Sequence, residues 1–301
     1  MGDVNEALPH DGGMRKLVRW GLYPFSWAIL LGGFHLMWTT ALEPRSIWGG
    51  SVAILASVFL ICEFALPYER RWAMTLASFW ADVKFAAINS LFVGGLSALL
   101  ALFTIRISGT LAGPAHDWPP QFQLLACLLI FEVINYSLHR AMHELRGPLG
   151  RWLWKSHAAH HLPPRLYLVM HAVFHPINGL IIQGLAITLP IWLMGYQDKV
   201  VTMFLMINGM HGLISHFNVD VRMGWFNYLF VGPELHRYHH SARIDESKNY
   251  GATLSIFDVL LGTFVYHPGV PPKDLGVFPE TGLPGYENTL AVLKLPFQGN
   301  H

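Results

Sequence analysis

The segment HRAMHELRGPLGRWLWKSHAAHH, residues 139–161, concentrates histidines in a chain that is otherwise apolar. His139 and His143 are four residues apart, and His157, His160 and His161 follow the pattern HxxHH. Residues three or four apart lie on one face of an α-helix, about 6 Å apart along its axis. Each motif is therefore expected to project two or three imidazoles in one direction.

The composition of the whole chain is typical of an integral membrane protein. Of its 301 residues, 52% are hydrophobic and 13% are charged, whereas about a quarter of the residues of a soluble domain are charged. The formal net charge is +1, so we expect no nucleic-acid partner. Cys62 and Cys127 form no CxxC motif, which indicates neither a disulfide framework nor a cysteine metal site.

Six apolar runs are candidates for membrane helices, because a spanning helix needs about 20 apolar residues. They cover residues 20–42, 48–67, 85–107, 120–138, 172–195 and 199–217, and the last two form a hairpin. Basic residues precede the first run and follow the second, fourth and sixth, which places both termini and these loops in the cytoplasm.

We therefore expect an all-α integral membrane fold with about four to six membrane helices and a cytoplasmic helical cap that carries the histidines. Residues 1–19 are expected to form a cytoplasmic tail. Residues 20–301 are expected to form a single domain, with the histidine core at about 82–268.

A second HxxHH motif, HRYHH at residues 236–240, repeats the spacing of the first. Further histidines lie at or near the predicted cytoplasmic ends of the last two runs: His171, His175, His211 and His216. Imidazole is the commonest metal ligand, and eight or nine ligands are too many for one ion. The pattern predicts a histidine-dominated dinuclear site. His35 and His116 lie outside the patterned groups, and we interpret them as structural.

Several segments resemble the fatty acid hydroxylase / sterol desaturase superfamily, over about residues 82–268. They are HRAMH (139–143), KSHAAHH (155–161), MHAVFHPINGL (170–180), ISHFN (214–218), and HRYHH (236–240) followed by NYGATLSIFDVLLGTF (249–264). The resemblance implies nine metal ligands: His139, His143, His157, His160, His161, His216, His236, His239 and His240. It makes His171, His175 and His211 further candidates, although HAVFHP has one residue more between its histidines than the family pattern.

Members of this superfamily use two iron ions and O2 to oxidise an unactivated C–H bond. By this resemblance the chain is an oxidoreductase that hydroxylates or desaturates a fatty acyl, sterol-like or other membrane lipid. Zinc can replace iron after overexpression, because it binds imidazole tightly. The sequence has no dinucleotide fingerprint, haem-attachment motif or iron–sulfur cysteines, so we expect a separate electron donor: a reductase with a ferredoxin or a cytochrome b5-like carrier. No catalytic residue is expected beyond the metal site.

Two other function classes use similar residues. A dizinc membrane hydrolase would activate water with the same ligands, but zinc needs only three or four of them. A metal transporter needs polar groups near the middle of the bilayer, and the middles of the first four runs have almost none. Metal content with O2 consumption would test the first alternative, and radiometal uptake into proteoliposomes the second.

Overall fold

The computed structural model describes residues 12–107 and 113–299, which form long helices followed by a cap of short ones. The long helices are α1 (Gly13–Thr39), α2 (Pro44–Ala65), α3 (Leu76–Ile107), α4 (Pro120–Glu144) and α8 (Asp198–Ser215). A sixth rod is continuous through α6 (Pro176–Ile181), the π-helical segment η3 (Ile182–Thr188) and α7 (Leu189–Met194). The described residues contain three isolated β-bridges and no strand, so the all-α prediction is confirmed.

The cap consists of α5 (Gly147–His161) and the chain that follows α8. Its helices are α9 (Pro233–His239), α10 (Ile256–Leu261) and α11 (Thr289–Lys294). Five short 3-10 turns complete the described part of the chain: Arg70–Trp72, Leu168–Ala172, Gly224–Tyr228, Pro279–Thr281 and Leu295–Phe297.

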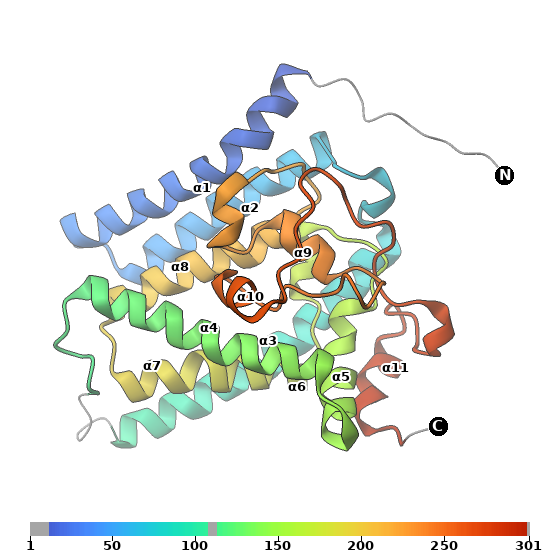
Figure 1. The fold of residues 1–301 in the computed structure, drawn as a ribbon. Helices are drawn as coiled ribbons and strands as arrows, with labels where there is room; N and C mark the ends of the chain where they lie inside the picture. Colours follow the sequence, from blue (N-terminus) through green and yellow to red (C-terminus); the bar gives the residue numbers. More distant parts are fainter. Residues whose placement is uncertain (1–11, 108–112, 300–301) are drawn as a thin grey trace.

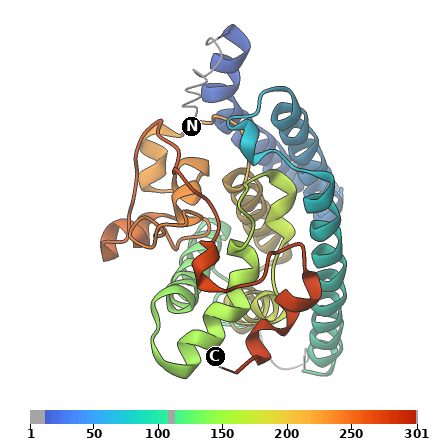
Figure 2. The ribbon, with the colours of Figure 1, turned by 90° about the vertical axis from the view of Figure 1, so that its right-hand side faces the viewer.

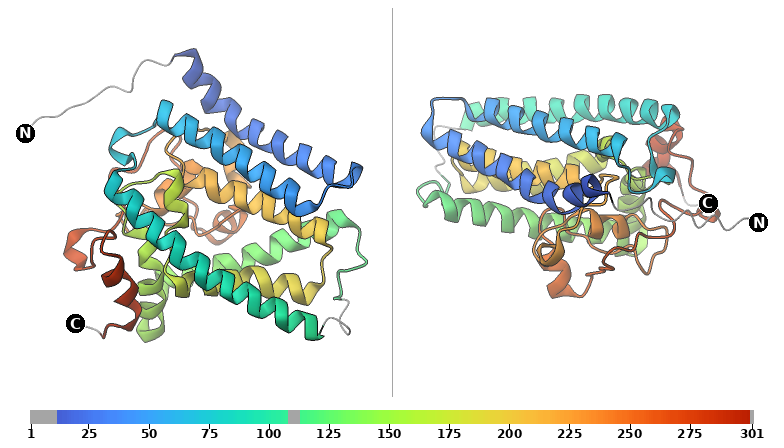
Figure 3. Two further views of the ribbon diagram at one scale, coloured as in Figure 1. Left: turned by 180° about the vertical axis from the view of Figure 1, so that it is seen from behind. Right: turned by 90° about the horizontal axis from the view of Figure 1, so that it is seen from above.

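The long helices lie side by side, and successive ones run in opposite directions, so that the end of one lies near the start of the next (Figure 1). Helices α1, α3 and α6 start at the end of the bundle where α2, α4 and α8 finish. The cap gathers at this end (Figure 2), and from behind α2 lies between α1 and α8 (Figure 3). This arrangement brings the ends of α4, α5 and α8, which carry most of the histidine motifs, into one region.

Among the residues that the structure describes, four helical segments are long and apolar enough to cross a membrane: Pro44–Ala65, Leu76–Leu96, Pro120–Glu144 and Pro176–Met194. The expected number of four to six membrane helices therefore holds at its lower bound. The predicted runs 20–42 and 199–217 do form α1 and α8, but neither helix meets the same criterion of length and apolar composition. Helix α8 begins with Asp198 and Lys199 and contains Asn208, and it packs against α1, α2 and α4.

Hydrogen bonds at the helix ends explain where the observed bounds differ from the apolar runs. Helix α3 begins at Leu76 because the Thr75 backbone N–H donates to Ser78 Oγ at 2.9 Å and the Ser78 N–H donates to Thr75 Oγ1 at 3.2 Å. Helix α6 begins at Pro176 because His175 Nδ1 accepts from the Ile177 N–H at 3.1 Å. Helix α1 begins within the predicted tail, of which residues 1–11 lie outside the described residues.

Apolar contacts and one buried carboxylate hold the bundle to the segments that carry the histidines. Phe59 of α2 stacks on Phe217, with ring centroids 4.9 Å apart. Glu63, also on α2, accepts backbone N–H bonds from Leu168 at 3.0 Å and from Asn218 at 2.8 Å. Leu168 lies three residues before His171, and Asn218 lies two residues after His216. The segments that carry these two histidines are thus attached to the same membrane helix.

Candidate metal centre

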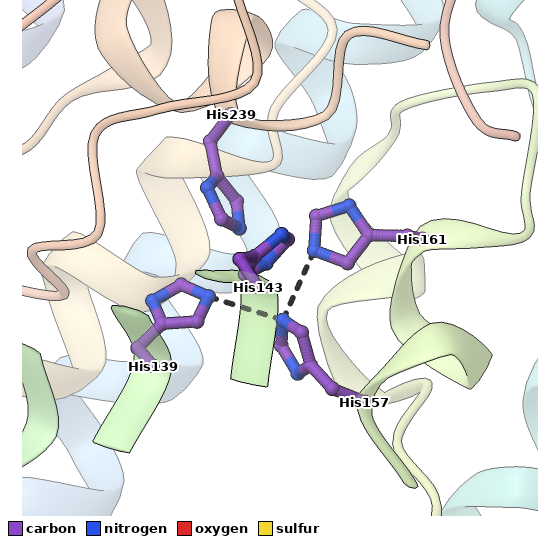
Figure 4. Close-up of side chains that lie close together, drawn as sticks. All are labelled: His139, His143, His157, His161 and His239. Carbon is purple, nitrogen blue, oxygen red and sulfur yellow. Dashed lines mark hydrogen bonds between the residues drawn. The ribbon is translucent and has the colours of Figure 1, made fainter. Parts of the chain in front are cut away.

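Nine histidines come together in two neighbouring groups at the cap end of the bundle. Within each group, one ring nitrogen of every residue lies within 4.8 Å of those of the others. The five-histidine group, drawn in Figure 4, consists of His139, His143, His157, His161 and His239. The four-histidine group consists of His160, His216, His236 and His240. These nine residues are those that the sequence resemblance implied as ligands.

Each HxxHH motif contributes to both groups, so the expectation that each projects its imidazoles in one direction is wrong for these motifs. On α5, His157 and His161 belong to the five-histidine group, whereas His160 belongs to the four-histidine group. Consecutive helical residues are about 100° apart around the axis, so His160 and His161 face different sides. The second motif divides in the opposite sense, since His239 alone enters the five-histidine group.

The ring nitrogens within each group are spaced as ligands of one ion would be. His157 Nε2 lies 3.0 Å from the Nε2 atoms of both His139 and His161 (Figure 4). In the other group, His216 Nε2 lies 3.0 Å from His160 Nε2 and 2.9 Å from His236 Nε2. Metal–imidazole bonds of about 2.1 Å at right angles would place two nitrogens about 3.0 Å apart.

Hydrogen bonding at the far side of the rings shows why a cation fits between them. The Nδ1 atom of His160 lies 2.9 Å from the Val173 carbonyl oxygen, and that of His216 lies 2.9 Å from the Gly212 carbonyl oxygen. A carbonyl oxygen only accepts, so in each neutral ring the hydrogen is on Nδ1 and the lone pair is on Nε2. The two Nε2 lone pairs face each other at 3.0 Å, an arrangement that a bound cation stabilises.

Burial keeps the cap histidines in the neutral form that binds metals. It lowers the pKa of His160 to about 3 and the pKa values of His157 and His161 well below the ordinary value. Burial likewise lowers the pKa values of the three histidines of the second HxxHH motif, namely His236, His239 and His240. Metal ligation requires deprotonated imidazole, so these rings are prepared for it at neutral pH.

Backbone carbonyls of the segment that follows the second HxxHH motif orient two rings of the five-histidine group. His139 Nδ1 lies 2.8 Å from the Tyr250 carbonyl oxygen, and His239 Nδ1 lies 2.9 Å from the Lys248 carbonyl oxygen. Such partners fix the tautomer and the direction of a metal-binding imidazole.

Glu132, on the membrane helix α4, holds the same segment in place. Its carboxylate is buried and accepts backbone N–H bonds from Ala252 at 2.7 Å, Thr253 at 2.9 Å and Leu254 at 2.7 Å. Asp258 contributes two more, from the N–H groups of residues 250 and 251 at 2.7 and 2.9 Å. The histidine pattern does not identify these two acids. The sequence feature that could have identified them is a carboxylate inside an apolar run, because such a group usually has a function in the fold or the site.

His171 lies beside the four-histidine group without belonging to it. Its Nδ1 atom is 3.3 Å from His216 Nδ1. Gly212 gives the ring its room, because a Cβ at this position would lie 2.6 Å from His171 Cε1.

The other candidates from the sequence lie outside both groups. His175 caps α6, and its Nε2 lies 3.1 Å from the Leu293 carbonyl oxygen. His211 Nδ1 lies 2.7 Å from the Val231 carbonyl oxygen, and its ring stacks on Phe230 with centroids 5.0 Å apart. His35 and His116 are exposed and take no part in either group.

Two cavities of different character reach the histidines. An apolar cavity of about 150 Å³ between α4, the α6–α7 rod and α8 is lined by Phe131, Met142, Phe174, Ile182 and five of the nine histidines. A more polar cavity of about 330 Å³ lies on the cap side. Its lining includes His143, His161, Glu144, Lys248, Ser241 and Ser247. The five-histidine group thus borders a strongly apolar space and a second space that has more polar residues in its lining.

Comparison with known proteins gives four results. The model of the family described as fatty acid hydroxylase matches residues 124–263, which include all nine grouped histidines. Ornithine lipid hydroxylase OlsE from Rhizobium tropici is 32% identical over 253 residues, covering 81% of this chain and 72% of that protein. Very-long-chain aldehyde decarbonylase GL1-10 from Oryza sativa subsp. japonica is 26% identical over 181 residues, covering 58% of this chain and 57% of that protein. No solved structure matches the chain.

Proposed function

Because the chain belongs to the fatty acid hydroxylase family and is an oxidoreductase, we propose that it hydroxylates an unactivated C–H bond of a membrane lipid with O2 and two iron ions. The observation that supports this most is the pair of neighbouring groups of five and four histidines. A structural metal needs about four ligands, so nine imidazoles at two adjacent positions favour a dinuclear redox centre.

The two histidine groups would each hold one iron ion, which when bound supplies the activation of O2. The side chains and backbone of the protein supply the ligands and orient them. Neutral imidazoles offer their Nε2 lone pairs, and the backbone carbonyls of Val173, Lys248 and Tyr250 fix the directions of three rings. Glu132 keeps the segment around Tyr250 in position.

The overall reaction converts a lipid C–H bond, O2, two electrons and two protons into a lipid C–OH group and water. The apolar cavity suits the lipid and excludes water from the bond that is oxidised. The polar cavity suits the exchange of protons and product water with the aqueous side. The two electrons come from a separate donor, for which we propose a reductase with a ferredoxin or a cytochrome b5-like carrier.

The site lies where membrane helices end, so a substrate whose chain rests in the bilayer can reach it from the side. One relative is named for ornithine lipid, and we propose an acylated polar lipid as the substrate here. We further propose that residues 20–301 form one domain and that the cap faces the cytoplasm, because basic residues gather in the loops at this end.

We expect the purified protein, reconstituted with ferrous iron, to hold two iron ions per chain. Elemental analysis together with protein quantification measures this ratio. Protein isolated with zinc in the same positions should bind two ions as well but lack hydroxylase activity, because zinc has no redox chemistry. A single ion per chain at undiminished activity would contradict the dinuclear proposal.

A further inference from the structure

Three asparagines line the apolar cavity beside the histidines. Asn135 comes from α4, Asn178 from α6 and Asn208 from α8. Apart from these residues and the histidines, most of the lining is apolar. An amide in such a space loses its hydrogen bonds to water, which is unfavourable unless another partner replaces them. Three amides around one small cavity therefore need an explanation.

Two of these amides have a nitrogen without a partner. The Nδ2 atoms of Asn135 and Asn208 are buried and form no hydrogen bond with any residue that the structure describes, and Asn135 is only 5% exposed. Asn178 Nδ2 contacts Met142 Sδ at 3.1 Å, and a thioether sulfur is a weak acceptor.

Other asparagines of the same protein serve as an internal comparison. Asn89 Nδ2 donates to the carbonyl oxygen of Phe174 at 2.8 Å. The Nδ2 atoms of Asn218, Asn227 and Asn249 also donate to backbone carbonyl oxygens, at 2.9, 3.1 and 2.9 Å. The amide nitrogens of Asn135 and Asn208 thus lack a partner at the cavity, whereas the amide nitrogens of these four residues are satisfied by the fold itself.

The two unpartnered donors lie close to the metal centre along the chain. Asn135 precedes His139 by one helical turn, about 6 Å along the axis of α4. Asn208 precedes Gly212 by one turn of α8, and both residues line the cavity together with His216. A cavity of about 150 Å³ is also smaller than the 300–1,000 Å³ that encloses a drug-sized ligand. It has room for only a short section of a lipid.

We propose that Asn135 and Asn208 bind a carbonyl oxygen of the lipid's ester or amide linkage, and that the carbon hydroxylated lies within a few bonds of it. A carbonyl oxygen has two lone pairs and can accept from both amides. The short cavity then places a carbon next to the linkage, rather than one deep in the alkyl chain, beside the histidines. This inference rests on the proposed function and names the part of the substrate that the site recognises.

Binding of small probes tests the assignment without any turnover. Iron-loaded protein in detergent is mixed with decanamide or with undecane, an alkane of matched length, and thermal unfolding is followed. Decanamide should raise the Tm of the wild type and undecane should not. The double variant Asn135→Leu/Asn208→Leu should lose this preference. The double variant Asn135→Ser/Asn208→Ser replaces each amide donor by a hydroxyl donor, so it should retain part of the preference. An equal response of the wild type to both probes would overturn the inference.

The position of the hydroxyl group gives the second readout. Fragmentation mass spectrometry of the product should place the new oxygen within about three carbons of the linkage. Asn135→Leu and Asn208→Leu should each raise KM about tenfold with a smaller change in kcat, and they should scatter the position of oxidation. The control Thr202→Val also removes a buried polar group from α8, but Thr202 bonds the Asp198 carbonyl oxygen and does not line the cavity.

The outcomes separate this inference from the proposed function. Hydroxylation in the middle or at the far end of an alkyl chain would refute the role of the asparagines and leave the hydroxylase assignment intact. A preference for decanamide that Asn135→Leu/Asn208→Leu abolishes, in a protein that oxidises no lipid, would support the carbonyl site and contradict the proposed reaction.

Discussion

His239→Ala and His240→Ala are each expected to abolish lipid hydroxylation while removing different metal ions. The two residues are adjacent in sequence, but His239 belongs to the five-histidine group and His240 to the four-histidine group. Losing a direct ligand should lower activity by about 100-fold or more, since even partners that only orient ligands are worth 10–100-fold. Each variant should retain roughly one iron per chain, in different coordination environments that X-ray absorption or Mössbauer spectra can distinguish.

His35→Ala is the matched control for these two variants, because His35 is an exposed histidine on a long helix and lies outside both groups. It should keep two iron ions and close to full activity. Both ligand variants should still insert into the membrane, since His239 and His240 belong to the cap region and lie outside the four apolar helices. Full activity in either His239→Ala or His240→Ala would show that the second HxxHH motif is not part of the centre.

Glu132→Leu is expected to cause the largest loss of stability among substitutions outside the histidine groups. Leucine removes the acceptor for three backbone N–H groups at residues 252–254, and Glu132 is 0% exposed. Each buried donor left unpaired costs about 1 kcal/mol or more, so we expect a loss of about 3 kcal/mol or more. The Tyr250 carbonyl would lose its position opposite His139, so metal affinity should fall as well.

Thermal unfolding in detergent and iron content after dialysis measure these two effects. Glu132→Gln keeps one oxygen that can accept, and it should be intermediate in both. Ser137→Ala, on an exposed part of the same helix where the hydroxyl bonds the Val133 carbonyl oxygen, should behave like the wild type. An unchanged Tm and full iron retention in Glu132→Leu would mean that this carboxylate does not hold the segment.

Much of the fold was predictable because apolar runs and histidine spacing are local features of the sequence. The runs located the long helices, and the short break between the runs 172–195 and 199–217 located the hairpin between the α6–α7 rod and α8. The approach of His139 to His239, with ring centroids 4.4 Å apart, was predictable from the alternation of basic loops, which assigns their segments to one side of a membrane. The nine candidate ligands were the nine residues that now form two groups.

The division of these residues between two groups was not predictable from spacing. A shared helical face is broad, and whether His160 or His161 turns to a given neighbour depends on how α5 crosses α4 and α8. The carbonyl partners of His139 and His239 come from an irregular segment whose path no periodic pattern encodes. The bonds of Glu132 and the unpartnered amide of Asn135 are tertiary features, so they became evident only in the structure.

Isotope labelling of the product tests whether the oxygen atom added to the lipid comes from O2. Membranes that contain the wild-type protein, with a reductase and carrier added, are supplied with ¹⁸O2 in ordinary water, and the extracted lipids are analysed by mass spectrometry. The proposed hydroxylation predicts a new lipid species that carries one ¹⁸O atom and is absent in His240→Ala membranes. A product whose new oxygen comes from water, as a metal-dependent hydrolase would give, would contradict it.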